Sequence, residues 1–119
     1  MKVERELIRG AGPAAVLQLL QRRDMYGYEL VEALSRRTDG VLAMGQSSLY
    51  PLLYSLEAKR LVESRWVDIP SGRRRRYYRL TDRGGAVLER RRAEWQELFQ
   101  AMVGLGLVNP IAEGGSARA

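Results

Sequence analysis

Apolar residues recur every three or four positions in three stretches of the first half of the chain, a pattern that predicts three amphipathic helices. The first covers residues 4–22, where Gly12-Pro13 interrupts the pattern, because proline costs about 3 kcal/mol inside a helix. Two structures are compatible with this interruption: one helix that bends at Gly12-Pro13, which we favour, or a separate arm followed by a helix that Pro13 opens. The second helix covers residues 26–37 and ends before the turn signal Thr38-Asp39-Gly40.

The third predicted helix covers residues 46–60. A serine of Gln46-Ser47-Ser48 is expected to cap it, and Pro51 falls within its first turn, where a missing N–H does least harm. One face carries leucines at i, i+3, i+4 and i+7 that we expect to be buried: Leu49, Leu52, Leu53 and Leu56. The opposite face is small or polar apart from one tyrosine: Ser47, Ser48, Pro51, Tyr54, Ser55 and Ala58.

After residue 61 the pattern changes to a rough alternation of β-branched and aromatic residues, which predicts strands at 62–69 and 75–80. Pro70-Ser71-Gly72 between them suits a hairpin turn with the glycine at positive φ. Two such strands are marginal alone, so we expect them to pack on the helices. Thr81 or Asp82 then caps a long final helix with an apolar side made of Leu88, Trp95, Leu98, Phe99, Met102 and Leu105.

This order of elements predicts an α+β fold, mostly α: a winged helix-turn-helix with a long C-terminal dimerisation helix. We expect residues 1–80 to form the DNA-binding domain, residues 81–106 the dimerisation helix, and residues 107–119 a disordered tail. In such a fold the helix over residues 46–60 enters the DNA major groove.

The amino-acid composition limits the kinds of site and partner that the protein can have. The 119 residues include 20 Lys plus Arg against 14 Asp plus Glu, a net charge of +6, with no His and no Cys. We therefore expect no metal site, no cofactor and no enzymatic activity, because zinc sites, Cys–His dyads and Ser–His–Asp triads need those side chains. The basic balance favours an anionic partner, nucleic acid before a membrane surface. The sequence has no signal peptide or membrane-spanning pattern, so we expect a cytoplasmic protein.

Arginine is concentrated in the predicted hairpin, where residues 65–79 contain six Arg and one acid, a local net charge of +5. The guanidinium fork suits phosphate, so we expect the tip to follow a DNA backbone or enter a minor groove. A solvated basic loop is the alternative. Tyr77 and Tyr78 are expected to anchor the strand, one ring in the core and one phenol near the backbone. The candidate DNA-binding residues of the hairpin are Arg73, Arg74, Arg75, Arg76 and Tyr77.

The helix over residues 46–60 has no Arg or Lys before Lys59-Arg60, so the bidentate Arg–guanine contact is missing from its first turns. Gln46 could read adenine, and hydroxyl groups could bind bases or phosphates. Tyr50 and Tyr54 could instead pack beneath the wing. The candidate DNA-binding residues of this helix are Gln46, Ser47, Ser48, Tyr50, Pro51 and Tyr54.

The final helix is longer than a small core can cover, which implies a partner helix, most simply that of a second subunit. Trp95 is then either part of a dimer core or one of two tryptophans beside a pocket for a flat aromatic ligand, since the chain has no thiol or imidazole with which to sense metals or redox state. The candidate effector-binding or interface residues are Trp95, Leu98, Phe99 and Met102.

Three segments resemble motifs of the PadR family of bacterial transcriptional regulators, in its short subfamily. Residues 26–30, Tyr-Gly-Tyr-Glu-Leu, resemble the GYEL motif, and residues 48–53 with 56–57 and 61–62 resemble LYPLL…LE…GLV. Residues 72–81 with Gly84 resemble the wing motif GxRxKYYRLTxxG. Together these cover residues from about 15 to 100. Arg60 stands where the family usually has Gly, and Tyr54-Ser55 replaces a commonly basic pair.

The resemblance implies a homodimeric repressor that binds double-stranded operator DNA through Tyr50 and the wing arginines and pairs through its C-terminal helix. In some members a tryptophan at the place of Trp95 stacks on phenolic or multidrug-type compounds. A small hydrophobic or aromatic effector at the dimer interface would then release the DNA. The alternative is a basic module that binds RNA or a protein partner without sequence-specific DNA recognition, for which the small-residue face of residues 47–58 has no evident use.

Overall fold

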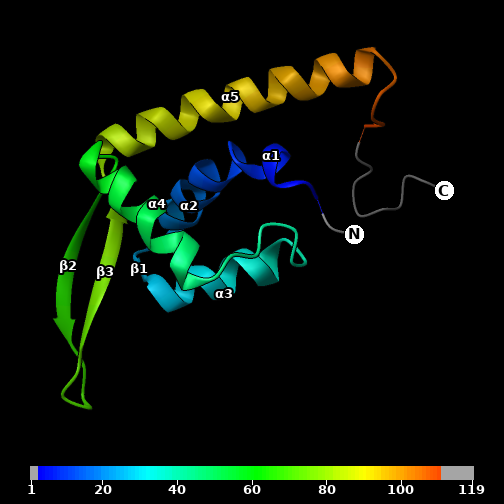
Figure 1. The fold of residues 1–119 in the computed structure, drawn as a ribbon. Helices are drawn as coiled ribbons and strands as arrows, with labels where there is room; N and C mark the ends of the chain where they lie inside the picture. Colours follow the sequence, from blue (N-terminus) through cyan, green and yellow to red (C-terminus); the bar gives the residue numbers. More distant parts are fainter. Residues whose placement is uncertain (1–2, 111–119) are drawn as a thin grey trace. The chain divides into compact units, whose positions relative to one another are not determined.

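The computed structural model describes residues 3–110 (Figure 1). The chain divides into two compact units, Met1–Glu89 and Arg90–Ala119. Within the described residues, no helix is both long and apolar enough to cross a membrane. The elements confirm the predicted α+β, mostly helical order: α1 (Arg5–Ile8), α2 (Ala11–Arg22), β1 (Met25–Tyr26), α3 (Gly27–Arg37), α4 (Gln46–Ala58), β2 (Val62–Asp68), β3 (Arg74–Leu80) and α5 (Asp82–Gly104).

The N-terminal segment forms two helices, α1 and α2, so the prediction of one helix bent at Gly12-Pro13 is wrong. The helix stops at Ile8 and resumes at Ala11, which places Pro13 in the first turn of α2. An unbroken helix would pair the nitrogen of Pro13 with the carbonyl of Arg9, but proline has no N–H and its ring clashes with that carbonyl. The break therefore falls one turn before the proline.

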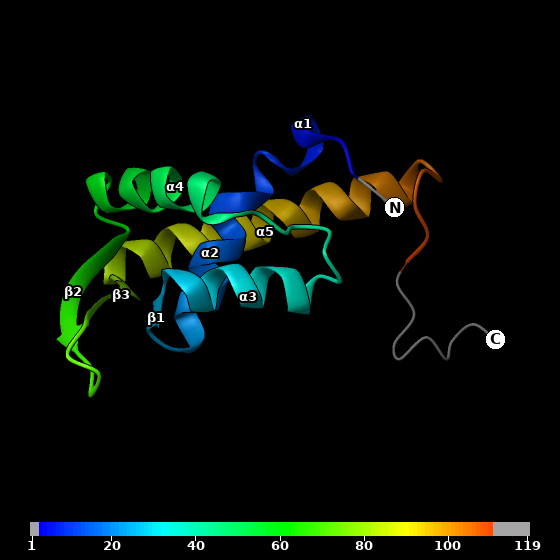
Figure 2. The same ribbon diagram turned by 60° about the horizontal axis from the view of Figure 1, so that its bottom comes forward.

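Helices α2, α3 and α4 pack together around the core of the first unit (Figure 2). The predicted leucine stripe of α4 is largely confirmed: Leu49 and Leu53 are fully buried, Leu56 is 3% exposed and Leu52 is half-buried. Tyr78 of β3 is the largest fully buried side chain. The other residues at the centre of the core are Val16, Leu17, Leu30, Leu34 and Val62.

Helix α4 begins without the serine cap expected from the sequence, because Gly45 occupies the N-cap position and no side chain caps the helix. The helix ends in a Schellman motif, in which the N–H of Leu61 bonds to the carbonyl of Leu56 and that of Arg60 to Glu57, both at 2.9 Å. Arg60 has a φ of 63°, the left-handed conformation for which this motif usually uses glycine. The predicted helix over 46–60 is therefore two residues too long.

Strands β2 and β3 form the predicted antiparallel hairpin, paired from Val62 opposite Leu80 to Asp68 opposite Arg74. Gly72 in the turn has a φ of 91°, as expected for this position. The sheet has a third strand that the sequence did not reveal: β1 pairs with β3, giving the order β1-β3-β2. Figure 1 shows the hairpin, hereafter the wing, reaching beyond the helices of this unit.

Helix α5 starts at the foot of the wing and is capped by Thr81, whose hydroxyl oxygen accepts the N–H of Gly84 at 2.9 Å. The helix ends at Gly104, and Gly106 follows with a φ of 79° in a second Schellman motif. Of the tail expected at residues 107–119, residues 111–119 lie outside the described part of the chain.

Candidate nucleic-acid interface

The face of α4 that turns away from the core is exposed and carries small or polar side chains. All but one of the candidate DNA-binding residues on this helix belong to it: Gln46, Ser47, Ser48, Pro51 and Tyr54. A helix with such a face can lie close to the floor of a major groove and offer amide and hydroxyl groups to base edges.

Tyr50 is half-buried and packs against the start of α3. A Cβ atom placed on Gly27 would lie 2.3 Å from the Tyr50 hydroxyl oxygen, so the phenol sits directly on the backbone of that residue. Its ring centre is 6.1 Å from that of Tyr54. Tyr50 is therefore a packing residue against the start of α3, whereas the alternative interpretation placed its ring beneath the wing.

The wing arginines differ in whether a neighbouring carboxylate neutralises their charge. Four of the six between residues 65 and 79 are bound to carboxylates in the pairs Arg65–Asp24, Arg74–Asp68, Arg76–Glu57 and Arg79–Glu63. Arg73 is exposed near the hairpin tip, and its guanidinium has no hydrogen bond or ion pair within the described residues. Arg75 has no ion pair there either, and its guanidinium lies 4.3 Å from the ring centre of Tyr26.

Arg76 connects the wing to α4. Its Nε donates to the Ser64 hydroxyl at 2.9 Å and its Nη2 donates to Glu57 Oε1 at 3.1 Å, while the same hydroxyl donates to Glu57 Oε2 at 2.7 Å. The guanidinium also lies 5.7 Å from the ring centre of Trp66. With its donors committed in this way, Arg76 sets the position of the wing relative to α4.

A hollow of about 350 Å³ opens between the start of α3, α4 and the wing. It brings together five of the candidate DNA-binding residues, two from α4 and three from the wing: Tyr50, Tyr54, Arg74, Arg75 and Arg76. Three further residues of its wall were not anticipated from the sequence: Tyr26, Gly27 and Trp66. The first two belong to the motif at residues 26–30, which was the one signal that could have pointed to them.

Tyr78 also contributes to this wall, although its hydroxyl oxygen is buried. Within the described part of the chain that oxygen has no hydrogen-bond partner, and the side chain is fully buried. Burial raises the pKa of Tyr78 above its ordinary value of 10.0, because the phenolate would lose its hydration, and the Arg76 charge opposes this rise only in part. The neighbouring candidate, Tyr77, is half-buried and packs edge-on against Tyr26 at 5.3 Å between ring centres.

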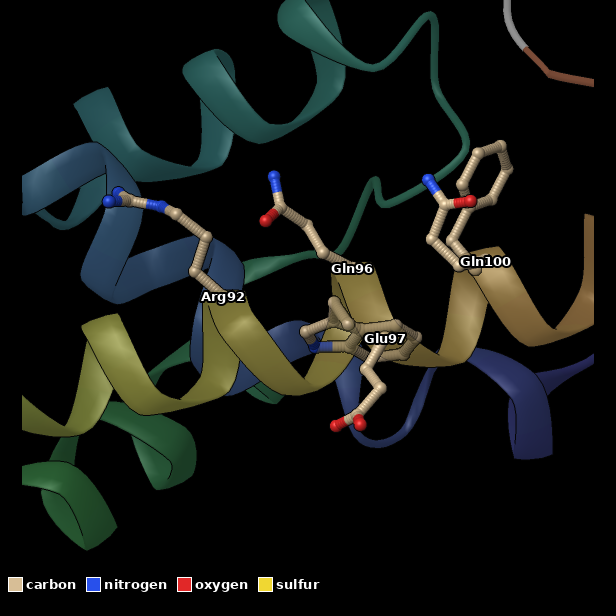
Figure 3. A pocket seen from close by; sticks show the side chains of 6 residues that line it. Arg92, Gln96, Glu97 and Gln100 are labelled. Atoms are coloured by element: carbon tan, nitrogen blue, oxygen red, sulfur yellow. The ribbon is translucent and has the colours of Figure 1, made fainter.

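In the second unit, the apolar stripe of α5 is partly exposed. Trp95 is 42% and Leu98 50% exposed, and Phe99 and Met102 are half-buried. Trp95 and Phe99 line an open hollow of about 620 Å³ together with Arg92, Gln96, Glu97 and Gln100 (Figure 3). All six residues come from successive turns of one helix, so the hollow has a single wall among the residues that the structure describes.

Three packed helices, a basic hairpin and a long following helix are the architecture of winged helix-turn-helix regulators of transcription. Residues 16–90 match the transcriptional regulator PadR-like family. The chain belongs to this family, which consists of transcriptional regulators and not of enzymes, and membership implies DNA binding.

Individual relatives agree with this assignment. The transcriptional regulator Rv3488 of Mycobacterium tuberculosis is 36% identical over 102 residues, which cover 84% of this chain and 90% of that protein. A protein X of Lysinibacillus sphaericus, described as uncharacterized, is 34% identical over 96 residues, 81% of this chain and 88% of that protein. The crystal structure of a PadR family transcriptional regulator from Eggerthella lenta has a TM-score of 0.75 at 36% identity and covers 87% of this chain and 88% of its own. A PadR family regulator from Clostridium difficile has a TM-score of 0.71 at 29% identity, with coverages of 78% and 95%.

Proposed function

We propose that the protein is a homodimeric transcriptional repressor that a small hydrophobic or aromatic effector releases from its operator. The observation that carries this proposal is the partly exposed apolar stripe of α5, from Trp95 to Met102, with a hollow that has only one wall. The same stripe on a second copy supplies the missing wall, and a twofold dimer places two copies of α4 for paired half-sites.

On the DNA side, we assign the exposed face of α4 to the major groove, where Gln46, Ser47 and Ser48 reach base edges. Arg73 and Arg75 of the wing bind backbone phosphates, because their charge is not neutralised by a carboxylate within the described residues. Arg74 also binds a phosphate after its ion pair with Asp68 opens, since the Asp68 side chain is 86% exposed. Arg76 and Tyr50 hold α4, α3 and the wing in place.

The effector acts by binding more tightly to one arrangement of the two α5 helices than to the other. A flat aromatic molecule between the two Trp95 side chains changes the angle between these helices. That angle sets the spacing of the two α4 helices, so the arrangement that holds effector fits the operator less well.

Sequence-specific repression is tested by a gel-shift titration with the DNA upstream of the protein's own gene. We expect the retarded complex to survive an excess of random duplex at physiological salt, because specific sites bind proteins of this class about 10³-fold or more tightly than random DNA. Equal competition by random DNA would exclude a sequence-specific repressor.

Dimerisation through α5 is tested by sedimentation of Leu98→Glu, which places a charge in the stripe and is expected to yield monomers. Ala93→Glu adds the same charge on an exposed position outside the stripe and should remain dimeric. If both variants sediment like the parent protein, α5 is not the interface.

The effector site is tested by quenching of tryptophan fluorescence with planar aromatic compounds. Trp66 on the wing also fluoresces, so the Trp95→Ala variant serves as the control. Quenching in the parent protein and not in the variant supports an effector site at Trp95. Equal quenching of both proteins contradicts it.

A further inference from the structure

A second arginine-rich region lies in the first unit, on residues that the sequence analysis did not single out. Arg22 and Arg23 at the end of α2, and Arg36 and Arg37 at the end of α3, surround a hollow of about 560 Å³. Met25 and Ala33, both buried residues, complete its wall. We call these four residues the α2–α3 arginine cluster; α2 and α3 lie side by side (Figure 2).

Within the described residues, three of the four guanidinium groups have no partner. The side chains of Arg22, Arg36 and Arg37 form no hydrogen bond or ion pair in this part of the chain. Arg23 Nη1 lies 3.3 Å from Glu29 Oε2 and donates to the carbonyl of Asp24 at the same distance.

The two acids closest in sequence to Arg23 are already engaged elsewhere. The other carboxylate oxygen of Glu29 accepts the backbone N–H of Tyr26 at 3.2 Å. Asp24 accepts a 2.6 Å hydrogen bond from Arg65 of the wing. Among the described residues, no acid lines the hollow, so this part of the chain leaves the cluster with an excess of positive charge.

Helix dipoles account for only part of this arrangement. A cation in the last turn of a helix is favourable, which explains Arg22 on α2 and Arg36 and Arg37 on α3 taken one helix at a time. It does not explain why arginines of both helices line one hollow, where like charges repel one another. A multivalent anion in the hollow would remove the repulsion.

We propose that the α2–α3 arginine cluster binds closely spaced phosphate groups. Guanidinium forks bind phosphate with two parallel hydrogen bonds, and arginines from two helices can engage neighbouring phosphates together. Two sources present this chemistry: the backbone of DNA beyond the segment that α4 and the wing contact, and a free polyphosphate such as that of a nucleotide.

The test compares Arg36→Gln/Arg37→Gln with Arg5→Gln/Arg9→Gln, a control that removes two exposed, unpaired arginines from the α1 segment. In the first arm, inorganic tripolyphosphate is titrated into each protein without DNA by calorimetry. In the second arm, the affinity for a long duplex is measured against salt concentration, where each lost phosphate contact lowers the log–log slope by about 0.9.

If the cluster binds free polyphosphate, tripolyphosphate binds the cluster variant at least tenfold more weakly than the control, and the DNA slope is the same in both. If it binds the DNA backbone, the slope of the cluster variant falls by about 2 relative to the control. A change in both arms means that the cluster accepts phosphate from either source. Cluster and control variants that match in both arms overturn the proposal.

Arg22→Gln provides an independent variant on the other helix, with a smaller effect in the same direction. Its thermal unfolding and that of the double variant are recorded first. All of these arginines are exposed and, within the described residues, unpaired, so we expect the variants to unfold at the temperature of the parent protein or slightly above it.

Discussion

In the wing, six arginines lie within residues 65–79, and four of them are bound to carboxylates. In the α2–α3 arginine cluster, four arginines come from two separate places in the sequence, and three of them have no partner within the described residues. The wing therefore has the higher density of charge in the sequence, whereas the cluster has more unpaired charge in the folded chain.

The pairing of the strands explains much of this difference. Glu63 lies directly opposite Arg79 and Asp68 directly opposite Arg74, so the hairpin register itself brings opposite charges together. The helix ends of the cluster have no facing strand to supply an acid. A count of arginines therefore overestimates the charge that this hairpin can offer to a ligand, whereas the two helix ends keep most of their charge unpaired within the described residues.

The largest effect is expected from the two wing arginines without ion pairs. Arg73→Gln/Arg75→Gln should lower the log–log salt slope of DNA binding by about 2, one unit for each lost phosphate contact, and weaken binding roughly tenfold or more. Arg74→Gln/Arg79→Gln removes the same formal charge from paired residues and should change the slope less. Affinities at four or more salt concentrations measure both slopes.

Equal slopes for the two wing variants would contradict the expected difference between paired and unpaired wing arginines. Such a result would mean that the ion pairs open on DNA and that Arg74 and Arg79 exchange their carboxylates for phosphates.

A change at Glu57 tests the role of the ion pairs by removing a carboxylate partner instead of an arginine. Glu57→Gln leaves Arg76 with its bond to Ser64 but without its ion pair, and we expect a loss of about 1 kcal/mol of folding free energy, since the pair is two-thirds buried. Thermal unfolding should show a midpoint lower by several degrees.

Glu63→Gln is the matched control, because its pair with Arg79 is half exposed and is expected to contribute less. If Glu57→Gln and Glu63→Gln unfold at the same temperature, Arg76 is not a structural connection between the wing and α4.

Arg60 lies outside both the wing and the α2–α3 arginine cluster. Its replacement therefore shows whether DNA binding depends on the net charge of the protein or on the charge at these two regions. Arg60→Gly should stabilise the fold by about 1 kcal/mol, because glycine adopts the left-handed φ of 63° without strain. The DNA salt slope should stay within error of the parent value. Chemical denaturation measures the stability, and a less stable glycine variant would mean that the Arg60 side chain has a stabilising contact elsewhere.

The smallest effect is expected at Tyr78, beside the paired arginines of the wing. Tyr78→Phe removes a buried hydroxyl without a partner and should be neutral or stabilising by up to about 1 kcal/mol at pH 7. Because the pKa of Tyr78 is raised above 10.0 in the folded state, deprotonation of this phenol favours unfolding. The stability of the parent protein is therefore unaffected by this titration below pH 10 and falls as the pH rises further.

Thermal midpoints between pH 9 and 11 should therefore fall more steeply for the parent protein than for Tyr78→Phe. Parallel curves would show that the phenol of Tyr78 reaches water or a partner.

Helical and strand periodicity predicted α2 to α5 and the hairpin because each is a long segment with a regular apolar pattern. β1 has only two residues, too few for a period, and it exists because Met25 and Tyr26 pair with Tyr78 and Tyr77 across the sheet. The break between α1 and α2 was expected at the proline, whereas the steric effect of proline acts one turn earlier.

The candidate site was predictable where its residues are adjacent in the sequence, as in the wing tip and the exposed face of α4. The Arg76 connection was not, because Glu57, Ser64 and Arg76 meet only through the packing of α4 on the hairpin. The α2–α3 arginine cluster was hidden for the same reason: it forms only when α3 packs against α2 and places Arg36 and Arg37 around the same hollow as Arg22 and Arg23.

The contacts of Thr81 determine where the chain can change length. The Thr81 hydroxyl donates to the carbonyl of Arg60 at 2.8 Å, and its N–H bonds to the carbonyl of Leu61 at 3.1 Å. These bonds fix Thr81, the cap of α5, directly after the last pair of the β2–β3 ladder. Residues added at the tip beside Gly72 leave that pair in place, whereas a residue added within either strand shifts the ladder and removes the cap. The wing tip can therefore lengthen or shorten as the protein evolves without moving the start of α5.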